Sequence, residues 1–254
     1  NESDRSLSKL FHDAVHTRCD ADTGKEISLA AVGGYGRGEL SPGSDLDILI
    51  LHNGKIAHEK LQAIVNDVLY PLWERNSVDH SVRTRSETRE SAASDLRVAT
   101  GLLDIRLIAG NPDLVAAVQG DSLEYWRKNT KQNLPELERS LSERHVRAGE
   151  LAYLLEPDLK EARGGLRDIQ ALRAIASSGA IHVPLEKISW AESTLNNVRE
   201  ALHTASGRGK NRLLFQEQDK VAKILEYKNA DAMMGDVARA ARSVDYLLDY
   251  TWHA

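Results

Sequence analysis

Hydrophobic residues in the first part of the chain follow helical and strand spacings in turn. The apolar residues that recur at helical spacing near the start are Leu7, Leu10, Phe11 and Val15. Residues 27–32 form a short apolar run that stops at a glycine pair, which is typical of a buried strand. The further elements predicted here are a strand at 45–51, an amphipathic helix at 56–73 and a strand of alternating polarity at 77–83.

After residue 95 the spacing is helical almost throughout. The helical segments predicted there are 96–108, one beginning at Asn111-Pro112, 134–153, 166–176, 185–205, 216–227 and 231–252, with irregular stretches at 155–165 and 206–211. We therefore expect an α+β fold. A small mixed-sheet domain over residues 1–110 would be followed by an all-helical domain over residues 111–254.

Composition narrows the class of protein. The chain has 254 residues, 41% hydrophobic and 28% charged, which is typical of a folded globular protein and not of a disordered one. Its net charge of −5 argues against nonspecific nucleic-acid binding, and no apolar run is long enough to predict a membrane span. A single cysteine, Cys19, excludes a disulfide framework and favours the cytoplasm. The sequence starts at Asn1, as in a processed protein or a piece of a longer one.

Glycines and aspartates gather between the first two predicted strands. Gly33 and Gly34 end the first strand, where glycine lets the backbone approach a ligand and offers amide groups to an anion. Asp45 and Asp47 are spaced so that both carboxylates share one face of a strand. Two such carboxylates repel each other unless a cation lies between them, and hard divalent cations prefer oxygen ligands. The pattern predicts a nucleoside triphosphate site that uses Mg²⁺ ions.

Other interpretations of this segment compete with the nucleotide site. The spacing Gly34-x-Gly36-x-Gly38 differs from the G-x-G-x-x-G dinucleotide fingerprint, and the Gly-Lys-Ser/Thr of a P-loop is absent. The remaining alternative is a glycine turn with a solvated aspartate pair at a strand edge. The complete succession of strand, glycine pair, aspartate pair and apolar strand favours the nucleotide site.

The glycine pair followed by Asp45-x-Asp47 resembles the signature of the DNA polymerase beta-like nucleotidyltransferase superfamily. Residues 31–40, Ala-Val-Gly-Gly-Tyr-Gly-Arg-Gly-Glu-Leu, are similar to one branch of it, the bacterial PII uridylyltransferases, which modify the nitrogen-signalling PII protein. The other segments similar to the N-terminal portion of that family are 80–84, 94–96, 156–160, 164–169 and 211–215.

The resemblance implies roles for individual residues. Gly33 and Gly34 would hold the triphosphate through backbone amides, helped by Ser44, and Arg37 would belong to the same binding segment. Asp45 and Asp47 would bind two Mg²⁺ ions. A tyrosine hydroxyl of PII would attack the α-phosphorus of UTP or ATP, transfer UMP or AMP, and expel pyrophosphate.

A third carboxylate is expected near this pair, because many members of the superfamily carry one on a neighbouring strand. Asp79, in the predicted strand 77–83, is the candidate. The sequence does not decide which face of the sheet it occupies. The alternative is an exposed edge residue that pairs with Arg83.

The irregular stretch 156–165 is a candidate loop over the triphosphate. Lys160, Arg163 and Arg167 are cations suited to phosphates, and we predict that Lys160 and Arg167 bind them. The alternative is a structural connector. Full-length family members continue into an HD phosphohydrolase domain and glutamine-sensing ACT domains, which this sequence lacks; its His12-Asp13 dipeptide is interpreted as a solvated helix face.

Two other functions stay open at this point. One is a related transferase that modifies another protein, such as glutamine synthetase. The other is a nucleotide-sensing module without turnover, which would bind ATP or UTP and release no pyrophosphate.

Overall fold

The computed structural model describes residues 2–19, 23–41, 43–73, 77–207 and 209–253. The chain divides into two compact units. The first comprises Asn1–Leu40 and Ser44–Lys128, and the second comprises Ser41–Gly43 and Asn129–Ala254.

A four-stranded mixed sheet forms the centre of the first unit. Its strands are β1 (Ile27–Ala31), β2 (Leu46–His52), β3 (Val78–Thr84) and β4 (Arg106–Gly110), in the spatial order β3-β2-β1-β4. β2 and β3 are parallel, whereas β1 pairs antiparallel with both β2 and β4. The mixed sheet and the helical remainder confirm the predicted α+β class.

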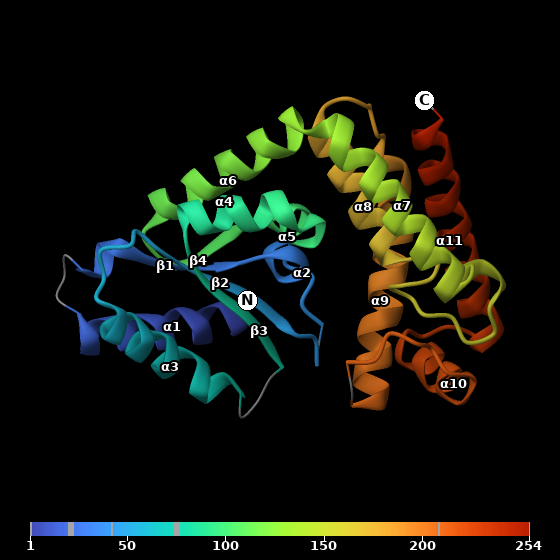
Figure 1. Ribbon diagram of the computed structural model, residues 1–254. Helices are drawn as coiled ribbons and strands as arrows, with labels where there is room; N and C mark the ends of the chain where they lie inside the picture. Colours follow the sequence, from blue (N-terminus) through green and yellow to red (C-terminus); the bar gives the residue numbers. More distant parts are fainter. Residues whose placement is uncertain (1, 20–22, 42, 74–76, 208, 254) are drawn as a thin grey trace. The chain divides into compact units, whose positions relative to one another are not determined.

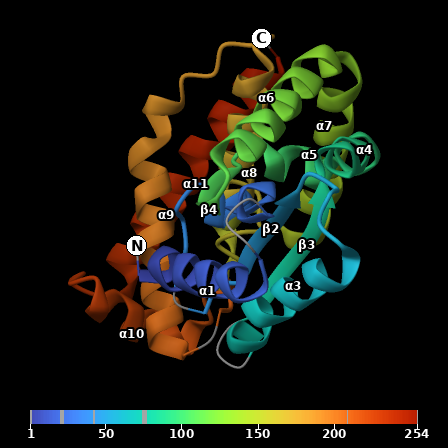
Figure 2. The same cartoon turned by 90° about the vertical axis from the view of Figure 1, so that its left-hand side faces the viewer.

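Helices cover both faces of this sheet (Figure 1). The helices on one face are α1 (Glu2–Arg18) and α3 (His58–Trp73), which lie side by side in Figure 2. Those on the other face are α4 (Arg85–Ser94), α5 (Leu96–Leu102) and α6 (Pro112–Lys128). The core beneath α1 and α3 contains Phe11, Ile48 and Val68, all at most 1% exposed. Burial of these apolar side chains is the main source of the stability of this layer.

One expectation about the first unit was wrong. Residues 96–108 were expected to be one helix, but α5 ends at Leu102 and residues 106–110 form strand β4. The apolar run is helical only in its first part, because Arg106–Gly110 pairs with β1. The first compact unit extends to Lys128, past the boundary predicted near residue 110, because α6 lies against α4, α5 and the sheet.

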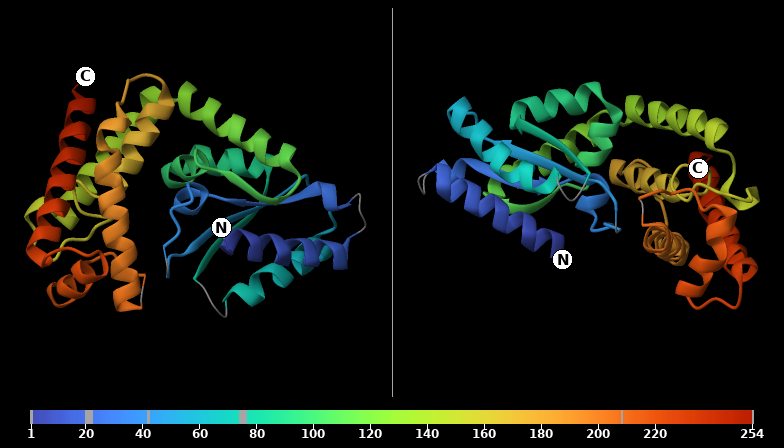
Figure 3. Two further views of the ribbon diagram at one scale, coloured as in Figure 1. Left: turned by 180° about the vertical axis from the view of Figure 1, so that it is seen from behind. Right: turned by 90° about the horizontal axis from the view of Figure 1, so that it is seen from below.

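The second unit is helical in all its regular elements among the described residues. Its elements are α7 (Thr130–Ala148), η2 (Leu151–Tyr153), α8 (Leu166–Ser178), η3 (Leu185–Ile188), α9 (Ser189–Ser206), α10 (Phe215–Ile224) and α11 (Ala230–Trp252). Figure 3 shows α9 and α11 running alongside each other. Leu195 and Leu202 of α9 and Val237 of α11 are completely buried. The remaining short elements of the chain are η1 (Thr23–Glu26) and α2 (Gly33–Gly36), both in the first unit.

Candidate active site

The glycine pair forms a single helical turn at the end of β1. Val32 is extended and precedes α2 (Gly33–Gly36), whose first residue, Gly33, has a φ of 54° that favours glycine. The Val32 amide donates to the Asp47 carbonyl oxygen at 3.1 Å. A β-carbon on Gly33 would lie 3.6 Å from Asp47 Oδ2. The turn therefore rests directly against the carboxylate of Asp47.

The register of the sheet places a second carboxylate beside this one. Asp47 in β2 is paired with Asp79 in the parallel strand β3. Paired residues of neighbouring strands point to the same face, and Leu46 and Ile48 are buried in the core on the other face, as predicted. Asp79 therefore shares the face of Asp47, which answers the question that the sequence left open.

Asp45 and Ser44 directly precede β2. The strand begins one residue later than predicted, so period-two alternation does not fix the orientation of Asp45, which is exposed. Within the described ranges, no group of three or more His, Cys, Asp and Glu side chains is close enough to hold a metal. A carboxylate donor set nevertheless suits Mg²⁺, which usually keeps water ligands and is completed by substrate phosphates. The residues present thus fit that cation.

Arg37 follows the glycine turn and is held by two carboxylates. Its Nη1 donates to Asp104 Oδ2 at 2.5 Å and its Nη2 to Glu39 Oε2 at 2.9 Å, with the side chain only 10% exposed. Burial alone would lower the pKa of Arg37, but the hydrogen bonds and charges of Glu39 and Asp104 outweigh it and raise the pKa. The predicted role of Arg37 in triphosphate binding stays a prediction. The contacts that the structure shows belong to the architecture of the turn.

Arg106, at the start of β4, holds the same turn from its carbonyl side. Its Nε donates to the Gly36 carbonyl at 3.1 Å and its Nη2 to the Tyr35 carbonyl at 3.2 Å. Asp4 accepts two further bonds from this guanidinium and one from the Tyr35 hydroxyl at 2.8 Å. Burial, followed by the bond to Asp4, raises the pKa of Tyr35 far above its ordinary value. The phenol therefore stays neutral and serves as a donor.

Asp104 and Arg106 were missed at the sequence level. Gly36 lies so close to this segment that an added β-carbon would be 2.0 Å from the Asp104 carbonyl oxygen. The two residues fall in the stretch that the apolar spacing assigned to a helix. Asp104 lies two residues before β4 and Arg106 is its first residue, so this Asp-x-Arg pair was a usable signal only once residues 106–110 were assigned to a strand.

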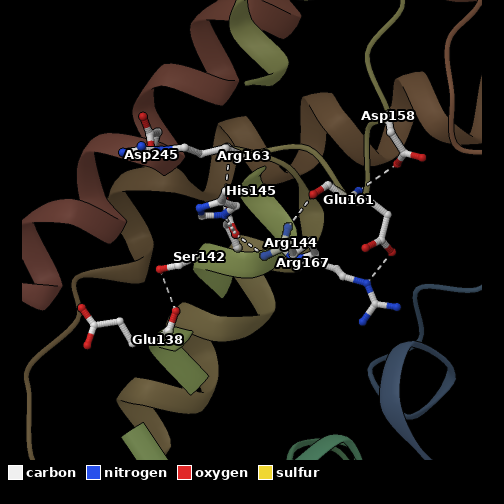
Figure 4. Close-up of polar contacts among 11 residues, drawn as sticks. Glu138, Ser142, Arg144, His145, Asp158, Glu161, Arg163, Arg167 and Asp245 are labelled. Atoms are coloured by element: carbon white, nitrogen blue, oxygen red, sulfur yellow. Dashed lines mark hydrogen bonds and ion pairs between the residues drawn. The ribbon is translucent and has the colours of Figure 1, made fainter. Parts of the chain in front are cut away.

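The loop 156–165 belongs to the second unit and is organised around Asp168, which is fully buried. Its Oδ1 accepts from Arg144 Nη2 at 2.5 Å and lies 2.9 Å from His145 Nε2, while Oδ2 accepts from the Gly164 amide at 2.6 Å. Figure 4 shows Arg144 and His145 projecting from α7 toward the loop. Burial would raise the pKa of Asp168, but His145 and Arg144 lower it overall. The carboxylate therefore stays ionised and holds the loop.

The cationic side chains in and next to the loop differ in their ion pairs and in their exposure to solvent. Arg163 binds Asp245 at 2.5 Å and Asp249 at 2.9 Å, so its charge is already matched within the second unit. Arg167 Nε donates to Glu161 Oε1 at 2.5 Å, and its side chain remains 42% exposed. Lys160 is half-buried. Binding of phosphate by Lys160 and Arg167 stays a prediction.

His12 and Asp13 are exposed on α1, consistent with the interpretation of this dipeptide as a solvated helix face. Among the described residues, no helix combines the length and apolar character needed to cross a lipid bilayer.

The sequences of both units match known protein families. Residues 16–90 match the family model of the nucleotidyltransferase domain, and residues 132–252 match that of the GlnD PII-uridylyltransferase. A bifunctional uridylyltransferase/uridylyl-removing enzyme of Streptomyces coelicolor is 50% identical over 227 residues, which is 89% of this chain and 27% of the relative. The chain belongs to the PII-uridylyltransferase family.

Other members of the PII-uridylyltransferase family show the same partial coverage. Enzymes with the same name are 39% identical in Mycobacterium tuberculosis, over 87% of this chain and 28% of the relative, and 38% identical in Vibrio campbellii, over 86% and 27%. The chain thus spans about a quarter of the length of these relatives. The resemblance inferred from residues 31–47 is confirmed, and the nucleotidyltransferase match contains the glycine turn, Asp45, Asp47 and Asp79.

Proposed function

We propose that this chain transfers a nucleoside monophosphate, UMP or AMP, from the triphosphate to a tyrosine hydroxyl of the PII signalling protein. Pyrophosphate would be released, and Mg²⁺ would be required. The observation that carries the proposal is the position of the glycine turn against Asp47, with Asp79 in register beside it. Membership of the PII-uridylyltransferase family supports PII as the acceptor.

The glycine turn would hold the triphosphate. The first amides of a helical turn have no carbonyl partner within that turn, so those of Gly33 and Gly34 would be offered to phosphate oxygens, with Ser44 nearby in sequence. Asp45 and Asp47 would hold Mg²⁺, which when bound would offset the negative charge of the triphosphate. Lys160 and Arg167 would add cationic contacts to the phosphates.

Chemistry at the site would be mainly a matter of positioning. The tyrosine oxygen would form a bond to the α-phosphorus while the bond from that phosphorus to the bridging oxygen breaks, and pyrophosphate would carry away the electron pair. Asp79 lies on the face of Asp47, where a carboxylate would act as a further cation ligand or accept the tyrosine proton. Asp104 and Arg106 would keep the glycine turn in place.

The decisive experiment is the intact mass of purified PII after incubation with this chain, Mg²⁺ and either UTP or ATP. A mass increase that corresponds to UMP or AMP, together with pyrophosphate release, would support the proposal and identify the nucleotide. Nucleotide binding without release would favour the sensing module. Labelling of glutamine synthetase in place of PII would favour the related transferase.

We predict that Asp45→Asn and Asp47→Asn each lower the transfer rate by about 10²–10³, the scale of losing one preorganised electrostatic group. Asp13→Asn, which removes an exposed carboxylate on α1, is the matched control and should leave the rate unchanged. Near-full transfer by either site variant would refute the assignment of the carboxylates.

A further inference from the structure

One side of α11, with the neighbouring segment η3, borders a hollow of about 500 Å³ within the second unit. The lining residues that matter here are Lys187 of η3 and Arg239, Arg242, Tyr246 and Tyr250 of α11. The α11 residues recur at intervals of three and four and therefore form one stripe of the helix.

The stripe is not needed to attach α11 to its own unit. Val237, Val244 and Leu248, on another side of the helix, are at most 2% exposed and form that attachment. In contrast, Tyr246 is 74% exposed and Tyr250 is 58% exposed. Aromatic surface that the fold leaves in water is a common mark of an interaction site.

The hollow is cationic although the chain as a whole carries a charge of −5. Within the part of the chain that the structure describes, neither Lys187 nor Arg242 makes an ion pair. No Asp or Glu is among the described residues that line the hollow. The third cation, Arg239, is the exception, because Asp236 on the same helix binds it.

The other acidic residues in this part of α11 pair with a residue that does not line the hollow. Asp245 and Asp249 both bind Arg163 of the loop 156–165. The Arg239 guanidinium lies 5.7 Å from the ring centroid of Trp190, which is itself 40% exposed. The surface thus presents uncompensated positive charge beside exposed aromatic rings, and tyrosine, tryptophan and arginine are the residues that dominate binding energy at protein interfaces.

We propose that this hollow docks an acidic polypeptide segment of a partner protein. The carboxylates of the segment would bind Lys187 and Arg242, and an apolar side chain of the segment would cover Tyr246 and Tyr250. This proposal does not depend on the proposed nucleotide transfer, because none of these residues belongs to the site built around Asp47.

Two other anionic occupants fit less well. Small-molecule sites bury about 70–90% of their ligand, whereas the tyrosines that border this hollow are mostly exposed. Nucleic-acid binding proteins commonly make about 6–10 phosphate contacts from a basic face, and this hollow offers few cations in an acidic chain. A short acidic segment with one apolar anchor matches both the charge and the exposed rings.

The test uses fluorescence anisotropy of a labelled synthetic peptide that contains Asp, Glu and one Phe, blocked at both ends. The matched peptide has Asn and Gln in place of the acidic residues. We expect the acidic peptide to bind, the neutral peptide to bind at least about tenfold more weakly, and added salt to weaken binding. Arg242→Glu and Tyr246→Ala should each raise the Kd at least about tenfold.

Lys131→Glu is the charge-matched control, because Lys131 is exposed on α7 and does not line the hollow. Thermal unfolding should show that all variants remain folded. Equal binding of the two peptides, an equal effect of Lys131→Glu, or no effect of Arg242→Glu and Tyr246→Ala would overturn the proposal. So would preferential binding of pyrophosphate or of a poly-U oligonucleotide at the same residues.

Discussion

Replacing Gly36 by alanine tests how closely the glycine turn is fitted to its neighbour. The added β-carbon would lie 2.0 Å from the Asp104 carbonyl oxygen and 3.0 Å from its carbonyl carbon. Close carbon–oxygen contacts in proteins are about 3.3 Å, so the two segments would have to separate by about 1.3 Å. The obstacle is backbone, which cannot move aside by changing rotamer.

The expected cost lies at the upper end of the range for overpacking. Such insertions cost about 1–3 kcal/mol, and here the glycine turn is tied to the segment that contains residue 104 by two hydrogen bonds from Arg106. We therefore expect Gly36→Ala to destabilise the first unit by about 3 kcal/mol and to lower its Tm by roughly 10 °C. Displacement of the turn should also weaken nucleotide binding, measured by calorimetric titration at a temperature where the variant is folded.

Gly101→Ala is the matched control, because Gly101 lies in α5 and an added β-carbon would meet no atom within 4 Å. It should be neutral or stabilising by up to about 1 kcal/mol, since alanine favours a helix over glycine. Thermal and urea unfolding of the two variants would decide. A Gly36→Ala variant as stable as Gly101→Ala would show that the turn is not closely packed on residue 104, and the reasoning would fail.

Three further predictions concern charged groups. Asp104→Asn should lower the affinity for triphosphate by about tenfold, because it weakens the bond that holds Arg37, and Arg37→Lys should have a similar effect in the same titration. Asp168→Asn should cost about 3–5 kcal/mol in urea unfolding, because the buried guanidinium of Arg144 would lose its charged partner. The pKa of Asp168 is lowered by folding, so its contribution is present above about pH 4 and is lost as the pH falls further; the variant should show a flatter stability profile there. Lys160→Ala and Arg167→Ala should each weaken binding of a nonhydrolysable triphosphate with Mg²⁺ by about 1–3 kcal/mol.

Each of these predictions has a contrary outcome. Unchanged triphosphate affinity in Asp104→Asn would separate the turn from ligand binding, and an unaltered acid profile in Asp168→Asn would remove that carboxylate from the pH dependence. Unchanged affinity in both Lys160→Ala and Arg167→Ala would leave the loop as a structural connector.

The sequence revealed those parts of the fold that local patterns determine. The strands near Ile27, Leu46 and Val78 were predicted from apolar runs, alternation and the glycine pair that ends the first. Strand β4 was missed because its five residues continue an apolar run and become a strand only by pairing with β1, far away in the sequence. Nonlocal pairing of this kind leaves no local signal.

The same distinction applies to the candidate site. Alternation showed that Asp79 and Arg83 share a face, but only the register with β2 placed Asp79 beside Asp47. The sequence identified Arg37 and Arg163 as cations near phosphate-binding segments. It could not reveal that Arg37 is held by Glu39 and Asp104. Nor could it reveal that Arg163 is held by Asp245 and Asp249, since most of these partners are distant in the chain.

The hydrogen bond between the Val32 amide and the Asp47 carbonyl has a mechanical consequence. Through it, the segment that would hold phosphate and the residue that would hold the cation are joined by one backbone contact between adjacent strands, with no hinge between them. A substitution at Ile48 that changes the size of the side chain, even by one methylene group, should therefore displace the glycine turn and the Asp47 carboxylate together. Substitutions at Ile48 would alter the affinities for the triphosphate and for the cation in parallel, because the two segments move as one rigid unit.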